Sequence, residues 1–312
     1  MKIGIFTGPQ NVPWEQMRSA WEFADRSGFD SGFVWDHLIP LHGSIDNDQF
    51  EGWTVLTALA MVTENLEVGH LVLANTFRHP ALLSKMATTL DHATGGRLVL
   101  GIGTGYYPAE HESYGLPLPS KKDRAAMLGE SLEILRGMWA PGRFSFKGEY
   151  YTVEDAAAEP LPVQSPHPPI LLGGAGERLL RNTARYADRW DLPDGAAGVT
   201  PDHFRMKREK LEAMCDEIDR DANEIEKSTS LMPIIGTEQD VKRRITEVQE
   251  FIGWDDEQTR RHLLAGTPEQ VLEQLASWQE AGVDQLLLSL WPTLNYGDLE
   301  VFAETVLPAY RA

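Results

Sequence analysis

The sequence predicts an α/β protein that closes into a (β/α)8 TIM barrel with insertions. Short apolar runs alternate with amphipathic helical stretches roughly eight times along the chain, and eight strand–helix units are the number that closes such a barrel. Strands joined by helices pair in parallel, because a parallel pair needs a crossover connection. We therefore expect one domain over residues 1–312, with an open doubly wound sheet as the alternative architecture.

The apolar runs give the expected barrel strands in order. The first run is followed by a helix that carries Trp14 and Trp21 on its apolar face and ends at Gly28. Three successive leucines at 286–288 mark the last strand as buried on both faces. The strands are expected at residues 2–7, 31–36, 68–74, 98–103, 170–173, 189–192, 231–236 and 284–290.

The connections between these strands are of two kinds. The helix before the last strand is short and well marked, since Thr267 can cap it, Pro268 fits its first position and Gln270 completes a capping box. Two longer connections stand apart from this pattern. Residues 141–169 carry a hairpin signal and are interpreted as a barrel insertion, and residues 38–52 are expected to form a lid or a dimer contact.

Composition limits the classes of function. A formal charge of −19 argues against nucleic-acid binding, which requires Lys and Arg side chains that neutralise phosphates. No segment reaches the ~20 apolar residues of a membrane span, and the chain passes from Met1 straight into a strand. The lone Cys215 makes no internal disulfide, which suits the cytoplasm, where we expect the protein. The histidines form no metal-binding motif, so no metal site is expected, and His111, His167 and His203 are expected on the surface.

A polar pair follows the second strand, at the end of the barrel where active sites lie. His37 suits proton transfer near neutral pH, and the neighbouring Asp36 can fix its tautomer. A histidine that only caps the strand end is the other interpretation. The position favours catalytic roles for both residues.

The third and fourth strands end in groups that suit a planar ligand. Asn75 and Thr76 offer donors and acceptors to a polar ring edge, unless they only form a loop and helix cap. Gly101, Gly103 and Gly105 alternate with other residues, and the third glycine comes too early for a dinucleotide fingerprint. A strand that leaves room for a cofactor fits these glycines better.

The fifth strand runs into small residues that open a helix. Gly173, Gly174, Ala175 and Gly176 expose successive backbone N–H groups, which can cradle a phosphate, and Arg178 adds charge. A plain tight turn before the helix is the alternative.

Taken together, these motifs resemble the luciferase-like monooxygenase superfamily, and within it the oxidoreductases that depend on the deazaflavin coenzyme F420. The resemblance runs almost from end to end. It is carried by Asp36-His37, residues 76–85, 95–98, 100–105, Glu110 with Tyr114-Gly115, and residues 168–174, 184–188, 265–269 and 281–284.

The resemblance implies a barrel that binds F420, or alternatively FMN, at its carboxyl end, and that is often a homodimer. It implies that His37 serves as acid or base in hydride transfer and that a non-prolyl cis peptide lies near residues 71–73. The cofactor contacts expected on this basis are Val72, Ala74, Asn75, Thr76, Gly103 and Gly105, with Gly173, Gly174, Ala175, Gly176 and Arg178 near the phosphate.

Two departures from the family pattern bear on the substrate. The sugar-phosphate dehydrogenases of this branch carry a catalytic Glu where this chain has Tyr106, and a Trp shortly after the His, where it reads Leu-Ile-Pro-Leu at 38–41. Sugar-phosphate oxidation is therefore not expected. Tyr106, Tyr107, Trp190 and Trp291 predict an aromatic pocket instead.

The sequence thus leads to one hypothesis with two alternatives. The hypothesis is hydride transfer between C5 of F420 and a small organic substrate, with His37, oriented by Asp36, handling a proton. The first alternative is an FMN-dependent monooxygenase that uses reduced flavin and O2, and the second is a non-catalytic deazaflavin or flavin carrier.

Overall fold

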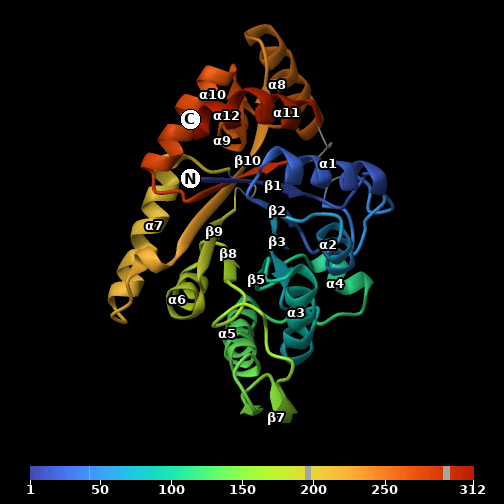
Figure 1. The fold of residues 1–312 in the computed structure, drawn as a ribbon, viewed down its shortest axis with the longest axis vertical. Coiled ribbons are helices and arrows are strands. Elements are labelled where there is room, and N and C mark those ends of the chain that lie inside the picture. Colours follow the sequence, from blue (N-terminus) through green and yellow to red (C-terminus); the bar gives the residue numbers. More distant parts are fainter. Residues whose placement is uncertain (42, 194–197, 291–295) are drawn as a thin grey trace.

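The computed structural model describes residues 1–41, 43–193, 198–290 and 296–312. Parallel strands gather at the centre of the molecule and helices surround them (Figure 1). The barrel order is β1-β2-β3-β5-β8-β9-β10-β12, and β12 pairs again with β1. Pairing of β9 with β10 completes the ring, so the sheet is closed and the open alternative is wrong.

The strands of the main sheet follow the chain as β1 (Lys2–Thr7), β2 (Ser31–Val34), β3 (Glu67–His70), β4 (Leu73–Ala74), β5 (Leu98–Gly103), β8 (Ile170–Gly173), β9 (Arg189–Leu192), β10 (Glu226–Ile235), β11 (Leu263–Gly266) and β12 (Gln285–Ser289). Of these, β4 extends the sheet along β5, and β11 pairs with the end of β10. The first, fourth, fifth and sixth expected strands are confirmed with their predicted bounds.

The helices follow as α1 (Trp14–Ser27), α2 (Gly52–Ala60), α3 (Pro80–Thr94), α4 (Pro108–Ser113), α5 (Lys121–Met138), α6 (Glu177–Tyr186), α7 (Pro201–Asp216), α8 (Glu238–Ile252), α9 (Asp256–His262), α10 (Pro268–Glu280), α11 (Tyr296–Val301) and α12 (Leu307–Arg311). The expected capping box at Thr267 is present in α10. Within the described ranges, no helix is both long and apolar enough to cross a membrane.

The other four expected strands differ from the structure, the second and the eighth only in their bounds, since they span Ser31–Val34 and Gln285–Ser289. The third is interrupted after His70, and a cis peptide bond joins Leu71 to Val72, as the resemblance implied. The seventh begins at Glu226 rather than Leu231, because its barrel-facing part is polar and carries no hydrophobic signal. Those polar groups are satisfied across the sheet, since the Ser228 hydroxyl donates to Oδ1 of Asp191 at 2.7 Å.

The insertion at residues 141–169 contains the expected hairpin, formed by β6 (Arg143–Lys147) and β7 (Thr152–Ala157). It lies at the far end of the molecule from α8 in Figure 1. The buried carboxylate of Asp91 in α3 fixes the return of the insertion, because it accepts hydrogen bonds from the backbone N–H groups of Val163 and Gln164.

The two ends of the barrel interior contain different kinds of side chain. At the amino ends of the strands, Arg189 pairs with Glu67 at 2.7 Å, and Lys2 pairs with Glu226 at 2.9 Å. Towards the carboxyl ends, an apolar cluster is built from Phe33, Val99, Leu171 and Leu287, with Phe6, Leu71 and Val72 packed against it. Phe6, Leu71 and Val72 also line a cavity at this end of the barrel.

Candidate active site

A cavity of about 840 Å³ opens at the carboxyl ends of the barrel strands, where barrel enzymes hold their ligands. Its apolar floor is made by Phe6, Leu71 and Val72, which also pack on the interior cluster. The other described lining residues are Trp35, Asp36, His37, Leu41, Leu73, Ala74, Gly103, Thr104, Gly105, Tyr106, Tyr107, Glu110, Gly173, Asp191, Pro193, Ser230, Ile252, Gly253, Trp254, Gln258 and His262.

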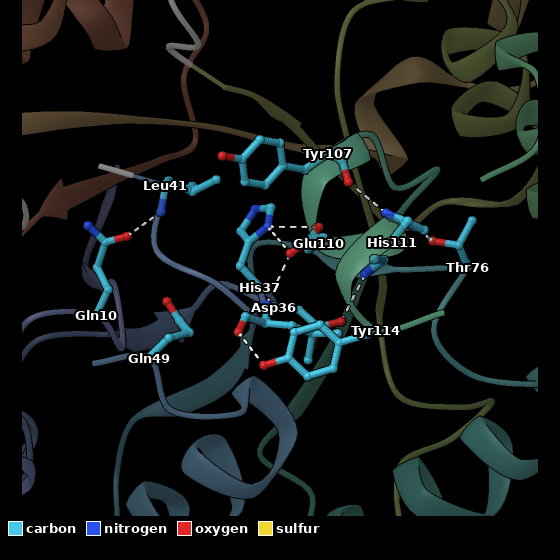
Figure 2. Close-up of polar contacts among 12 residues, drawn as sticks. Gln10, Asp36, His37, Leu41, Gln49, Thr76, Tyr107, Glu110, His111 and Tyr114 are labelled. Carbon is cyan, nitrogen blue, oxygen red and sulfur yellow. Dashed lines mark hydrogen bonds and ion pairs between the residues drawn. The ribbon is translucent and has the colours of Figure 1, made fainter. Parts of the chain in front are cut away.

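His37 follows β2 and lines this cavity with its imidazole ring. Its Nδ1 atom lies 3.0 Å from Oε2 and 3.1 Å from Oε1 of Glu110, and the backbone N–H of Leu38 donates to the same carboxylate (Figure 2). Glu110 is 1% exposed, so its charge is compensated by these donors rather than by water. The carboxylate holds the proton on Nδ1, which leaves Nε2 as the atom that can take up or release a proton.

Helix α4 carries Glu110 and places its carboxylate beside the ring of His37. The neighbouring His111 is buried, so its expected place on the surface is wrong. Its Nε2 lies 2.7 Å from the Thr76 hydroxyl, which ties α4 to the segment after β4, and its Nδ1 lies 2.7 Å from the carbonyl oxygen of Tyr107, the N-cap of α4 (Figure 2). The Tyr114 hydroxyl adds a bond to the Leu38 carbonyl, so α4 is attached to the His37 segment at both ends.

Asp36 does not orient His37, contrary to the expectation from sequence. Its carboxylate accepts two hydrogen bonds from Arg78, at 2.7 and 3.0 Å, and a third from the backbone N–H of Ala74. The described contacts of the Asp36 carboxylate go to Arg78 and Ala74, and none joins it to the ring of His37. It serves instead to fix the segment after β4 against the end of β2.

Arg78 connects Asp36 to Glu51, the N-cap of α2, at 2.5 Å. Burial opposes the guanidinium charge, but the two carboxylates outweigh it and raise the pKa of Arg78 above its usual value. Because Arg78 forms ion pairs with both carboxylates, its positive charge is already neutralised within the protein.

A second buried histidine lies beside this ion cluster. His70, at the end of β3, is fully buried and stacks on Trp53, with ring centroids 5.3 Å apart. Burial lowers its pKa to about 4, with a further lowering contribution from the positive charge of Arg78. His70 is therefore neutral near pH 7 and does not line the cavity.

Several residues expected near a cofactor ring lie together around the side chain of Val72 at the cavity. Val72, Ala74, Gly103, Gly105 and Gly173 all line the cavity, and their contact with a cofactor stays a prediction. A Cβ atom on Gly103 would lie 2.8 Å from Cγ2 of Val72, and one on Gly173 would lie 3.0 Å from Cγ1 of the same side chain. Glycine is thus needed beside Val72, and the exposed backbone with an apolar side chain fits the face of a planar ring.

Other residues expected to contact a cofactor do not line this cavity. The Asn75 side chain donates to the Tyr151 hydroxyl at 3.4 Å, and Thr76 is occupied by His111. Gly174, Ala175 and Gly176 lead into α6 (177–186), and Gly176 at its N-cap offers no side chain to the first N–H groups of the helix. Phosphate binding by this turn and the exposed Arg178 stays a prediction.

The expected aromatic pocket is confirmed in part. Tyr106 and Tyr107 line the cavity, with ring centroids 5.5 and 6.1 Å from that of His37, and Figure 2 shows the Tyr107 ring facing His37. Trp190 is instead a core residue that donates to the Gly174 carbonyl oxygen. Trp291 lies outside the described residues.

Sequence reasoning missed the wall that follows β10. Ile252, Gly253, Trp254, Gln258 and His262 come from the end of α8, the connection to α9, and α9 itself. No strand-end motif marks them, and only the folded chain brings them over the barrel mouth. Among the residues that the structure describes, no group of three or more His, Cys, Asp or Glu side chains gathers in a way that would hold a metal ion.

The arrangement agrees with the comparisons with known proteins. A model of the luciferase-like monooxygenase family matches residues 1–255. The chain belongs to this family. Its relatives include an FMNH2-dependent dimethylsulfone monooxygenase of Pseudomonas putida, 28% identical over 97% of this chain and 90% of the relative.

A relative with a different cofactor is similar to nearly the same degree. An F420-dependent glucose-6-phosphate dehydrogenase of Nakamurella multipartita is 27% identical over 93% of this chain and 90% of its own. The structure of an F420-dependent secondary alcohol dehydrogenase, in complex with an F420-acetone adduct, covers 100% of this chain and 99% of its own, with a TM-score of 0.85 at 21% identity. The family is thus one of oxidoreductases and monooxygenases in which both F420 and FMN serve.

Proposed function

We propose that this protein is an F420-dependent oxidoreductase that exchanges a hydride between C5 of the deazaflavin and a small organic substrate. The observation that supports it most directly is the Glu110–His37 pair, which presents one proton-transfer atom to a cavity with an apolar floor. Interconversion of an alcohol and a carbonyl moves one hydride and one proton, so it needs an acid or base beside the hydride carrier.

The residues would divide the work as follows. F420, when bound, supplies the hydride acceptor or donor. As an alcohol is oxidised, Nε2 of His37 takes the hydroxyl proton while the C–H hydrogen leaves as hydride and the C=O bond forms. Glu110 stabilises the resulting imidazolium through Nδ1, and the same groups return the proton in the reverse direction.

Tyr106 is not a candidate for this proton transfer. Desolvation in the cavity mouth and the negative charge of Glu110 raise the pKa of Tyr106 to about 12. Its phenol stays protonated near neutral pH and can donate a hydrogen bond to a ligand without giving up the proton. His37 is therefore the group suited to act as both acid and base.

The FMN-dependent monooxygenase is the second candidate, because the dimethylsulfone enzyme is similar over almost the whole chain. Titration of the purified protein with F420 and, separately, with FMN distinguishes the two, with ligand fluorescence as the readout. We expect selective, tight binding of F420. A preference for FMN, together with O2-dependent turnover of FMNH2, would contradict the proposal, and F420 binding without reduction by any donor would favour the carrier alternative.

A variant pair tests where the ring binds. Gly103→Ala places a methyl group against Val72 and should weaken cofactor binding. Gly129→Ala is the matched control, since its added Cβ would meet only Asn182 at 3.6 Å, an ordinary contact on α5. Equal affinities of the two variants would place the ring elsewhere.

A further inference from the structure

We propose that the substrate of this cavity is an uncharged organic molecule with an aromatic or apolar body and a hydroxyl or carbonyl group that meets Nε2 of His37. The inference rests on the proposed function for the position of the reacting group. It goes further by naming the chemical class of substrate that the cavity selects. The arguments for it are the charges of the lining residues and the aromatic and aliphatic side chains of the walls.

The cavity offers little to an anionic substrate. None of the described lining residues is Lys or Arg. Arg78 lies behind Asp36 and is balanced by two carboxylates. A carboxylate or phosphate on the substrate would therefore lose its hydration in the cavity and gain no cationic partner there.

The acidic side chains of the lining are engaged with protein groups. Asp36 accepts from Arg78 and the Ala74 N–H, Glu110 binds His37 and the Leu38 N–H, and Asp191 accepts from the Ser228 hydroxyl. These bonds hold the carboxylates in place as structural acceptors. A cationic substrate would compete with these protein donors for the carboxylate oxygens, which disfavours that class as well.

The walls suit a flat, apolar molecule. Trp254 stacks on His262 with ring centroids 4.1 Å apart and an interplanar angle of 20°, which holds the indole in one orientation over the barrel mouth. Tyr106 and Tyr107 flank His37, and Leu41 and Ile252 add aliphatic surface. Aromatic side chains offer large apolar surfaces to a ring, and His37 supplies the polar contact that orients the substrate.

Three probes of similar shape test the class. They are 2-acetylnaphthalene, its 6-carboxylate and its 6-trimethylammonium derivative, and their binding is followed by fluorescence with the cofactor-loaded protein and with the protein alone. We expect the neutral probe to bind at least about tenfold more tightly than either charged probe. Equal or tighter binding of a charged probe would overturn the inference.

A substitution at the cavity wall tests the cause. Leu41→Lys adds a cation at a lining position and should strengthen binding of the carboxylate probe by about tenfold or more, whereas Leu41→Met, the uncharged control, should not. An unchanged preference in Leu41→Lys would show that charge is not what the cavity selects.

The two proposals fail differently in these experiments. A protein that binds neither F420 nor FMN and still prefers the neutral probe would refute the proposed function alone. Tight F420 binding together with a preference for the carboxylate probe would refute the substrate class alone.

Discussion

Nδ1 of His37 lies 3.0 Å from Oε2 of Glu110, across 73 residues of sequence. The contact joins the end of β2 to a short helix that follows β5, and it leaves Nε2 as the proton-transfer atom of a ring that lines the cavity. Glu110 thus acts through His37, as a positioning residue that fixes one tautomer and offsets the charge of the protonated ring.

The first prediction concerns this positioning role. Glu110→Gln keeps an oxygen for the Leu38 N–H but removes the charge that stabilises an imidazolium, so we expect kcat to fall by about 10²–10³-fold with cofactor affinity nearly unchanged. The measurement is kcat and KM of a substrate that the wild-type protein accepts, together with the cofactor Kd.

The pH profile separates positioning from a purely structural role. In Glu110→Gln the acid limb of kcat should move to lower pH, because the protonated ring loses its counter-charge. Glu110→Asp restores the charge and should recover part of the rate. If the acid limb of kcat lies at the same pH in Glu110→Gln as in the wild type, Glu110 has a structural role only.

The second prediction concerns His37 itself. His37→Ala removes the proton-transfer atom and should lower kcat by at least about 10²-fold, while F420 affinity stays within about threefold of wild type. His92→Ala is the control, since His92 is an exposed residue at the end of α3. Unchanged turnover in His37→Ala would remove this residue from the mechanism.

The sequence revealed the barrel because strand and helix periodicities are local properties. The apolar runs at Lys2–Thr7 and Leu98–Gly103 are bounded as predicted, since four of the six residues of the first and all of the second are buried. The first half of β10 was missed because Ser228, Thr229 and Ser230 are buried polar residues, and no hydropathy pattern reveals the cross-strand bonds of Ser228 and Thr229.

The site was predicted where its residues follow strands and missed where they do not. His37, Val72 and Gly103 lie at strand ends and line the cavity. Glu110 was recognised as part of a family motif, but nothing in the sequence shows that its carboxylate reaches His37. Likewise, Trp254 reaches the barrel mouth only through the packing of α8 and α9, which local sequence does not encode.

The third prediction concerns the ion cluster behind the cavity. Arg78→Met leaves the fully buried side chain of Asp36 without its cation, and should lower the free energy of unfolding by about 3–5 kcal/mol, measured by urea denaturation. The double variant Asp36→Asn/Arg78→Met removes both charges and should be more stable than the single variant. A single variant within about 1 kcal/mol of wild type would show that Asp36 is compensated by other groups.

The fourth prediction concerns pH and His70. Its pKa is lowered to about 4 by burial, below the usual value of 6.5, so the unfolded chain takes up a proton between these pH values and the folded chain does not. This contribution to stability is fully present above about pH 6.5 and is lost as the pH falls towards 4. At about 1.4 kcal/mol for each unit of pKa difference, the loss amounts to about 3 kcal/mol.

The variant His70→Phe keeps a flat ring on Trp53 and removes the titrating group. Urea denaturation between pH 7.5 and 4.5 should therefore show a shallower loss of unfolding free energy for His70→Phe than for wild type. His92→Phe, at an exposed position, serves as the control and should follow the wild-type slope. Because wild type and His70→Phe share every other carboxyl and imidazole group, parallel curves for these two proteins would mean that His70 accepts its proton in the folded state as readily as in the unfolded chain.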